Sequence, residues 1–154
     1  MYERILVAVD GSTPSQRALD EAVKLVGLTQ GRIHLVSVVP PMLDPSAAGA
    51  YAGFVPVDTQ AVLEKDADDI LQAALAPLQA KGIAADSKRL DLDVGAQTIA
   101  EAILAEATAW KADVVVLGTH GRRGVTRLLL GSVAEALLRI STLPLLLVKS
   151  PETT

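Results

Sequence analysis

The sequence contains no cysteine, which excludes disulfide bonds, thiolate metal sites and cysteine nucleophiles. Aromatic residues make up only 3% of the chain, whereas 50% of its residues are hydrophobic, so aliphatic side chains must form the core. This composition suits aliphatic strands covered by helices rich in alanine and leucine. No apolar run approaches the roughly 20 residues that a transmembrane helix needs. We therefore expect an α/β protein without a membrane span.

The chain also lacks an excess of positive charge. Lysine and arginine total 14 and aspartate and glutamate total 18, which gives a formal net charge of −4. Such a chain is not expected to bind nucleic acid or anionic membrane surfaces. Its 154 residues are the length of one domain, and a strand pattern begins almost at once without the layout of a secretion signal. We expect one cytoplasmic domain over residues 1–154.

Five short apolar runs have the character of strands in a parallel sheet. They cover residues 5–9, 33–39, 83–90, 114–117 and 145–148. The runs at residues 5–9 and 114–117 are continuous, as in buried strands, whereas residues 83–90 alternate loosely and predict a half-exposed edge strand. Apolar residues at helical spacing between the runs predict four helices. Alternating strands and helices imply right-handed crossovers and a five-stranded parallel sheet, which is a Rossmann-like three-layer α/β sandwich.

Glycine and proline mark the expected ends of the helices. Thr13 is expected to cap the first helix with Pro14 in its first turn, and Gly31 to follow that helix. Pro77 must kink or end the second helix, and Gly82 stops it. Residues 40–57 show no periodicity, and a connection this long is either a surface insert or a functional lid. Residues 150–154 form a short tail.

Small and polar residues follow the first and fourth predicted strands. Asp10-Gly11-Ser12 follow the first, and Gly118-Thr119-His120-Gly121 follow the fourth. Ligands of open α/β sheets bind beyond the carboxyl ends of the strands, where the strand order reverses. If these two strands are neighbours there, the two loops face one cleft.

The second loop carries a pattern of glycines suited to phosphate. Gly118 and Gly121 are followed by nine residues and then by Gly131-Ser132, where the next helix begins. Glycine lets the backbone approach a ligand that a Cβ would exclude, and the N–H groups at a helix start attract anions. The spacing is neither that of a P-loop nor G-x-G-x-x-G. The intervening segment adds three cations, at Arg122, Arg123 and Arg127.

Together these residues resemble the nucleotide-binding branch of the universal stress protein family. The pattern of that branch, G-x2-G-x9-G-[S/T], is matched by Gly118, Gly121, Gly131 and Ser132. The resemblance covers nearly the whole chain, through Val-Ala-Val-Asp-Gly-Ser, Ala-Asp-Val-Val-Val-Leu-Gly-Thr-His-Gly and Pro-Leu-Leu-Leu-Val. It implies the strand order 3-2-1-4-5, ATP held between the first and fourth strands, and commonly a homodimer. No cluster of His, Asp and Glu has metal-ligand spacing, so Mg²⁺ is expected only with the nucleotide.

The resemblance also implies roles for individual positions. Asp10 would lie at the adenine and ribose end, with Ala8 and Val9 lining that side. Val38 would contact the base through its backbone, and Leu117 and Gly118 would touch the ribose. The phosphates would be held by Gly121, Gly131, Ser132, Val133 and Ala134. Arg122 is our own addition from its charge, because the family varies in that segment.

Several of these residues also have purely structural interpretations. Asp10 is suited to holding the turn after the first strand, and Ser132 to capping a helix. His34, on the second strand without an evident polar partner, is interpreted as structural or surface. His120 lacks the spacing of a catalytic triad, so we assign no catalytic residue.

The sequence favours an ATP-binding protein that regulates or protects in the stress response, with at most slow ATP hydrolysis. The alternative is an ATP-dependent hydrolase or transferase with an unidentified second substrate, but no general base or phosphoryl clamp is evident. A third possibility is a relative that binds another nucleotide such as FAD. Residues 143–149 form an apolar edge strand, which predicts a homodimer through that edge; the regulatory protein partner is not identifiable.

Overall fold

A computed structural model of the chain describes residues 1–41, 59–93, 95–120 and 130–149. Within them, five strands form one sheet in the order β3-β2-β1-β4-β5, and every neighbouring pair is parallel. The strands are β1 (Arg4–Ala8), β2 (Arg32–Val39), β3 (Ala85–Asp91), β4 (Val114–Gly118) and β5 (Leu145–Val148). The predicted sheet and its strand order are confirmed.

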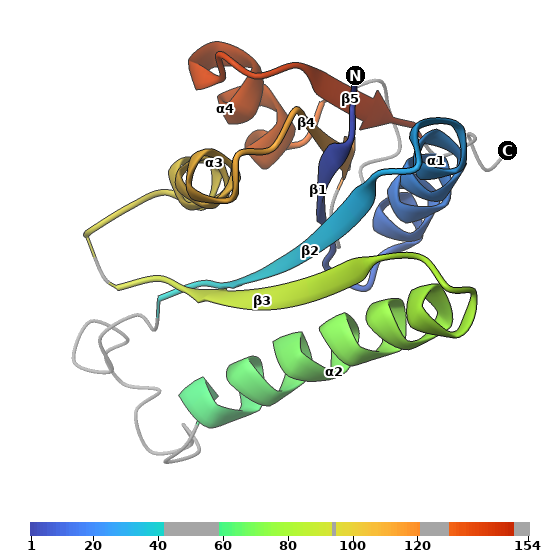
Figure 1. The fold of residues 1–154 in the computed structure, drawn as a ribbon. Helices are drawn as coiled ribbons and strands as arrows, with labels where there is room; N and C mark the ends of the chain where they lie inside the picture. Colours follow the sequence, from blue (N-terminus) through green and yellow to red (C-terminus); the bar gives the residue numbers. More distant parts are fainter. Residues whose placement is uncertain (42–58, 94, 121–129, 150–154) are drawn as a thin grey trace, which may run out of the picture.

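Helices cover both faces of the sheet and complete the three layers (Figure 1). The described helices are α1 (Thr13–Thr29), α2 (Thr59–Ala80), α3 (Ile99–Trp110) and α4 (Ser132–Ile140). Residues of α1 and α2 pack in one hydrophobic cluster with the sheet, and residues of α3 and α4 pack in the other. None of these helices is long and apolar enough to cross a membrane.

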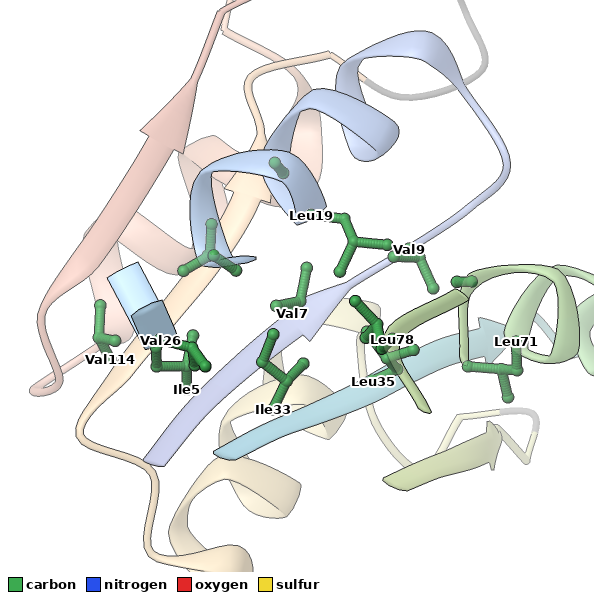
Figure 2. Packing of buried hydrophobic residues seen from close by; sticks show 14 residues of the cluster. Ile5, Val7, Val9, Leu19, Val26, Ile33, Leu35, Leu71, Leu78 and Val114 are labelled. Carbon is green, nitrogen blue, oxygen red and sulfur yellow. The ribbon is translucent and has the colours of Figure 1, made fainter. Parts of the chain in front are cut away.

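The continuous apolar runs of the sequence reflect burial on both faces. Ile5 and Val7 of β1 point toward α1 and α2, where Figure 2 shows them beside Leu19 and Val26, whereas Leu6 lies in the cluster on the opposite face. All three strand residues are fully buried. Residues of β3 alternate between exposed and half-buried, because only β2 pairs with this strand. The predicted edge strand is thereby confirmed.

The helix ends differ from the predictions by small shifts. Ser12, not Thr13, caps α1, and its side chain accepts a hydrogen bond from the Ser15 N–H. Gly31 follows α1 as predicted, after Gln30, which takes a left-handed conformation (φ 59°). Helix α2 continues past Pro77 to Ala80 and stops before Gly82, where φ is +75°.

Gly31 has a different structural purpose from the one that the sequence indicated. A Cβ on Gly31 would lie 2.3 Å from the carbonyl oxygen of Glu3, which is a backbone atom. Arg32 donates a hydrogen bond to that same carbonyl at 2.7 Å, so the start of β2 is held against the start of β1. The glycine is required because two backbone segments meet there.

Several predicted features lie outside the described residues. They include nearly all of the 40–57 loop, the 150–154 tail, and the segment with Gly121, Arg122, Arg123 and Arg127. For these positions the expectations from the sequence remain predictions.

The close approach at Gly31 predicts the effect of adding one methyl group. We expect Gly31→Ala to lower the free energy of unfolding by about 1–3 kcal/mol, because the backbone of β1 or β2 must shift. Gly27 is a matched control on α1 where an added Cβ meets no atom within 4 Å. Gly27→Ala should raise stability by about 0.5–1 kcal/mol through helix propensity. Urea unfolding of both variants measures this, and equal midpoints for Gly31→Ala and the unmodified chain would contradict it.

Candidate functional site

The loops after β1 and β4 lie at one edge of the sheet, because these strands are neighbours and parallel. After β1, the Asp10 carboxylate accepts a hydrogen bond from the Ser12 N–H at 2.9 Å. The Asp10 N–H in turn donates to the hydroxyl of Ser15, a residue that is 6% exposed, at 3.2 Å. Gly11 takes a φ of +80°, which favours glycine. Asp10 therefore does hold this turn, the structural interpretation that the sequence left open.

The start of α4 is fastened to the end of β4. The Gly131 N–H donates to the carbonyl of Thr119 at 2.6 Å, and the Thr119 N–H donates to the carbonyl of Val148 on β5 at 3.0 Å. Thr119 is only 4% exposed. Hydrogen bonds thus link β5, β4 and the first residue before α4, which fixes where that helix begins.

The two described glycines of the motif serve this packing. A Cβ on Gly131 would lie 2.8 Å from the Thr119 carbonyl oxygen, and one on Gly118 would lie 2.7 Å from the Pro14 Cβ at the start of α1. Sequence reasoning assigned both glycines to close approach of a ligand. In the structure, the direction of a side chain at either position is occupied by protein, so these glycines bring β4, α1 and α4 together.

The first turn of α4 has N–H groups without a side-chain cap. Gly131 is the N-cap residue and forms no side-chain hydrogen bond, whereas Ser12 caps α1 and Thr98 forms a capping box at α3. The Glu135 N–H is the first to bond back into the helix, to the Gly131 carbonyl. Among the described residues, no acceptor is found for the N–H groups of Ser132, Val133 and Ala134. N–H groups without acceptors at the positive end of a helix dipole are suited to an anion.

A backbone donor and acceptor lie side by side at Val38 on β2. The Val9 N–H donates to the Val36 carbonyl at 2.9 Å on the β1 side, and the Val39 carbonyl accepts from Leu92 on the β3 side. Because alternate residues of a strand turn their N–H and C=O groups to opposite neighbours, Val38 turns both groups toward β1. Strand β1 ends at Ala8, and no described residue of the following turn bonds to Val38.

The structure thus brings most of the predicted site residues to the carboxyl edge of three adjacent strands. β2, β1 and β4 contribute them in that spatial order, and the start of α4 supplies the rest. Val9 and Leu117 are 5% and 4% exposed, so their side chains belong to the core. The residues gathered here are Ala8, Val9, Asp10, Val38, Leu117, Gly118, Gly131, Ser132, Val133 and Ala134.

Helix α2 contributes to this edge in a way that the sequence did not indicate. An open pocket of about 330 Å³ lies beside the turn after β1, between the first turns of α1 and the middle of α2. Its α2 wall includes Asp69, Ile70 and Ala73. These residues reach the pocket because α2 packs on the same face of the sheet as α1. No local sequence motif identifies them.

The two histidines lie in different surroundings. His120 follows Thr119 at the edge, and its Nδ1 lies 3.0 Å from the Thr119 hydroxyl, while its buried Nε2 has no hydrogen-bond partner among the described residues. His34 lies near the amino end of β2, is 4% exposed, and meets carboxylates of β3 and α3. The structural interpretation of His34 is confirmed, but its polar partners are 52 and 72 residues away in sequence. Within the described ranges, no group of His, Asp and Glu side chains is placed to hold a metal ion.

Comparisons with known proteins agree with this architecture. A universal stress protein of Methanocaldococcus jannaschii is 28% identical over 99% of this chain and 85% of its own length. The structure of a universal stress protein in complex with cAMP superimposes with a TM-score of 0.67 at 24% identity, covering 99% of both chains. One from Archaeoglobus fulgidus in complex with dAMP has a TM-score of 0.67 at 21% identity, covering 96% of this chain and 98% of the other.

The family model described as the universal stress protein family matches residues 1–149. That match spans every described strand and helix, together with the turn after β1, the end of β4 and the start of α4. The chain belongs to the universal stress protein family.

Proposed function

We propose that this protein binds an adenine nucleotide, ATP foremost, across the carboxyl edge of β2, β1 and β4. The observation that carries the proposal is the uncapped first turn of α4, which Gly131 ties to the end of β4. Two structures with the same fold are complexes with cAMP and dAMP, which are adenine nucleotides. Mg²⁺ would come with the nucleotide, held mainly by phosphate oxygens and water.

The backbone of Val38 suits the adenine end of such a ligand. In the proposed complex its C=O accepts a hydrogen bond from the exocyclic amino group, and its N–H donates to the neighbouring ring nitrogen. Guanine presents a donor and an acceptor in the reverse order along its edge. If the ribose fixes the position of the base, adenine can form both hydrogen bonds with the Val38 backbone, whereas guanine cannot.

The start of α4 suits the phosphate end. The N–H groups of Ser132, Val133 and Ala134 point out of the helix start, and the exposed Ser132 adds a hydroxyl. The acidic residue of this turn, Glu135, pairs with Arg139 at 2.7 Å, which offsets its repulsion of an anion. Gly121 and Arg122 are further proposed phosphate contacts from the family resemblance and from charge.

The described site favours binding over catalysis. Its carboxylates are engaged, because Asp10 holds the turn after β1 and Asp69 pairs with Lys65, and among the described residues His120 contacts Thr119 rather than an acidic partner. Neither arrangement supplies the general base that a fast hydrolase or transferase needs. We therefore propose a cytoplasmic, nucleotide-controlled regulatory or protective factor of the stress response, with at most slow ATP hydrolysis.

We further propose that two copies associate through β5. This strand pairs only with β4, so one of its edges has no partner within the described chain. Leu146 on β5 is 37% exposed, and Leu138 and Ile140 on α4 are 53% and 47% exposed. An open apolar edge is an aggregation hazard, and the same strand of a second copy, antiparallel across a two-fold axis, would cover it.

The phosphate site is tested by Ser132→Ala. Loss of one hydroxyl contact to a charged group should weaken ATP binding by about 1–2 kcal/mol, roughly tenfold. Calorimetric titration of MgATP into the folded variant measures the change. Ser141→Ala, at the opposite end of α4, is the matched control, and its affinity should equal that of the unmodified chain. Unchanged affinity in Ser132→Ala would remove Ser132 from the site. A substitution at Gly131 is a poorer test, because any added side chain would displace Thr119 and change the fold as well as the binding site.

The proposed dimer is tested by Leu146→Glu. A charge on the open edge of β5 should convert a dimer to a monomer in sedimentation experiments at micromolar concentration, while MgATP binding persists. Leu28→Glu places the same charge on an α1 residue that is 84% exposed, and it should remain dimeric. An unmodified chain that sediments as a monomer throughout would defeat the proposal.

A further inference from the structure

A buried histidine on the α3 side of the sheet lies between two carboxylates. His34 of β2 is 4% exposed. Its Nδ1 hydrogen-bonds to Oδ1 of Asp86, the residue paired with it on β3, and its Nε2 lies 3.0 Å from Oε1 of Glu106 on α3. Lys88 of β3 binds the other oxygen of Glu106 at 2.7 Å. We call His34, Asp86, Lys88 and Glu106 the His34 cluster.

An aromatic stack covers the histidine ring. The indole of Trp110, the last residue of α3, lies 4.9 Å from the His34 ring centroid at an interplanar angle of 15°. The guanidinium of Arg4 on β1 lies 4.3 Å from the Trp110 ring centroid and donates hydrogen bonds to the Trp110 carbonyl. The imidazole is thus held in one orientation by contacts from β3 and α3.

The hydrogen bonds of the cluster require two N–H groups on one ring. An ionised carboxylate only accepts hydrogen bonds, and a neutral imidazole carries a single N–H. The imidazolium carries two, so it alone satisfies Asp86 and Glu106 together. Burial by itself raises the pKa of Glu106, but hydrogen bonds from Lys88 and His34 outweigh burial and leave that pKa below its ordinary value of 4.5. Glu106 is therefore ionised at neutral pH.

We propose that His34 is a buried proton-binding site whose imidazolium ties α3 to strands β2 and β3, so that loss of its proton loosens this attachment. The proton also balances the charges that meet here. Asp86 and Glu106 contribute two negative charges, Lys88 contributes one positive charge, and the imidazolium supplies the second. Among the described residues, Arg4 of β1 directs its guanidinium to Trp110 and the carbonyls at the end of α3 rather than to these carboxylates.

The sign of the pH dependence follows from the hydrogen bonds. Loss of the His34 proton would leave Asp86 or Glu106 facing a ring nitrogen without an N–H, so the deprotonated ring makes one hydrogen bond fewer to these carboxylates. Stability therefore falls as that proton is lost. Glu106 acts at the other end of the scale, because its lowered pKa contributes stability that is lost as the pH falls below about 4.5. Between these limits the cluster is complete.

Nitrogen NMR of the full chain, labelled at the histidine rings, tests the proposal directly. The chain has two histidines, and the variants His34→Gln and His120→Gln assign their signals. We expect both ring nitrogens of His34 to carry protons at pH 7. A neutral ring with one protonated nitrogen at that pH would overturn the proposal, and the measurement on the unmodified chain does not depend on any variant folding.

Thermal unfolding between pH 6 and 9 tests the consequence for stability. We expect the melting temperature of the unmodified chain to fall by about 2–4 °C over this range. Glu106→Gln should flatten the pH dependence of the melting temperature. The carboxylate of Glu106 is only 11% exposed, and a neutral amide in its place would not hold the His34 proton. Glu21→Gln is the matched control, since Glu21 pairs with Lys24 on the surface of α1 and is 43% exposed. Equal pH dependence in all three proteins would contradict the proposal.

Discussion

The hydrogen bond between the Gly131 N–H and the Thr119 carbonyl sets the geometry on which the candidate site depends. It brings the start of α4 against the end of β4, and Gly118 lets the same strand end pack on Pro14 of α1. Both contacts need a residue without a Cβ. The two glycines therefore act indirectly, by holding the end of β4 and the starts of α1 and α4 together around the candidate site. A side chain at Gly118 or Gly131 would collide with Pro14 or Thr119 rather than point toward a ligand or solvent. These glycines are therefore required for packing, whatever else the motif does.

The parallel sheet was predictable because local signals agree with the final fold, whereas its strand order came from the family resemblance. Continuous apolar runs mark strands covered on both faces, and the loose alternation of β3 marks an edge. Apart from the cap of α1, the details that escaped prediction depend on residues distant in sequence. Gly31 looks like a helix end but separates the starts of β1 and β2, and the partners of His34 come from β3 and α3. No local spacing encodes such contacts.

The candidate site was predictable in its position but not in its physical reasons. Glycine spacing and the turn after β1 located the edge, and the family resemblance supplied Val38. The N–H and C=O groups of Val38 have no partner on β1 because β1 ends at Ala8 while β2 continues to Val39. This depends on the register between the two strands, which the sequence does not reveal. Strand β2 also carries His34, four residues before Val38, so the proposed proton site and the proposed nucleotide site involve opposite ends of one strand.

The central claim is that an adenine nucleotide lies between the backbone of Val38 and the first turn of α4. The most direct test is a nitrogen–proton NMR titration of the full chain with MgATP, following the amide signals of Val38, Val133 and Ala134. The account predicts that these signals shift together with one dissociation constant, and that MgGTP at equal concentration leaves Val38 unshifted. Shifts confined to other parts of the chain, or none at millimolar MgATP, would contradict it.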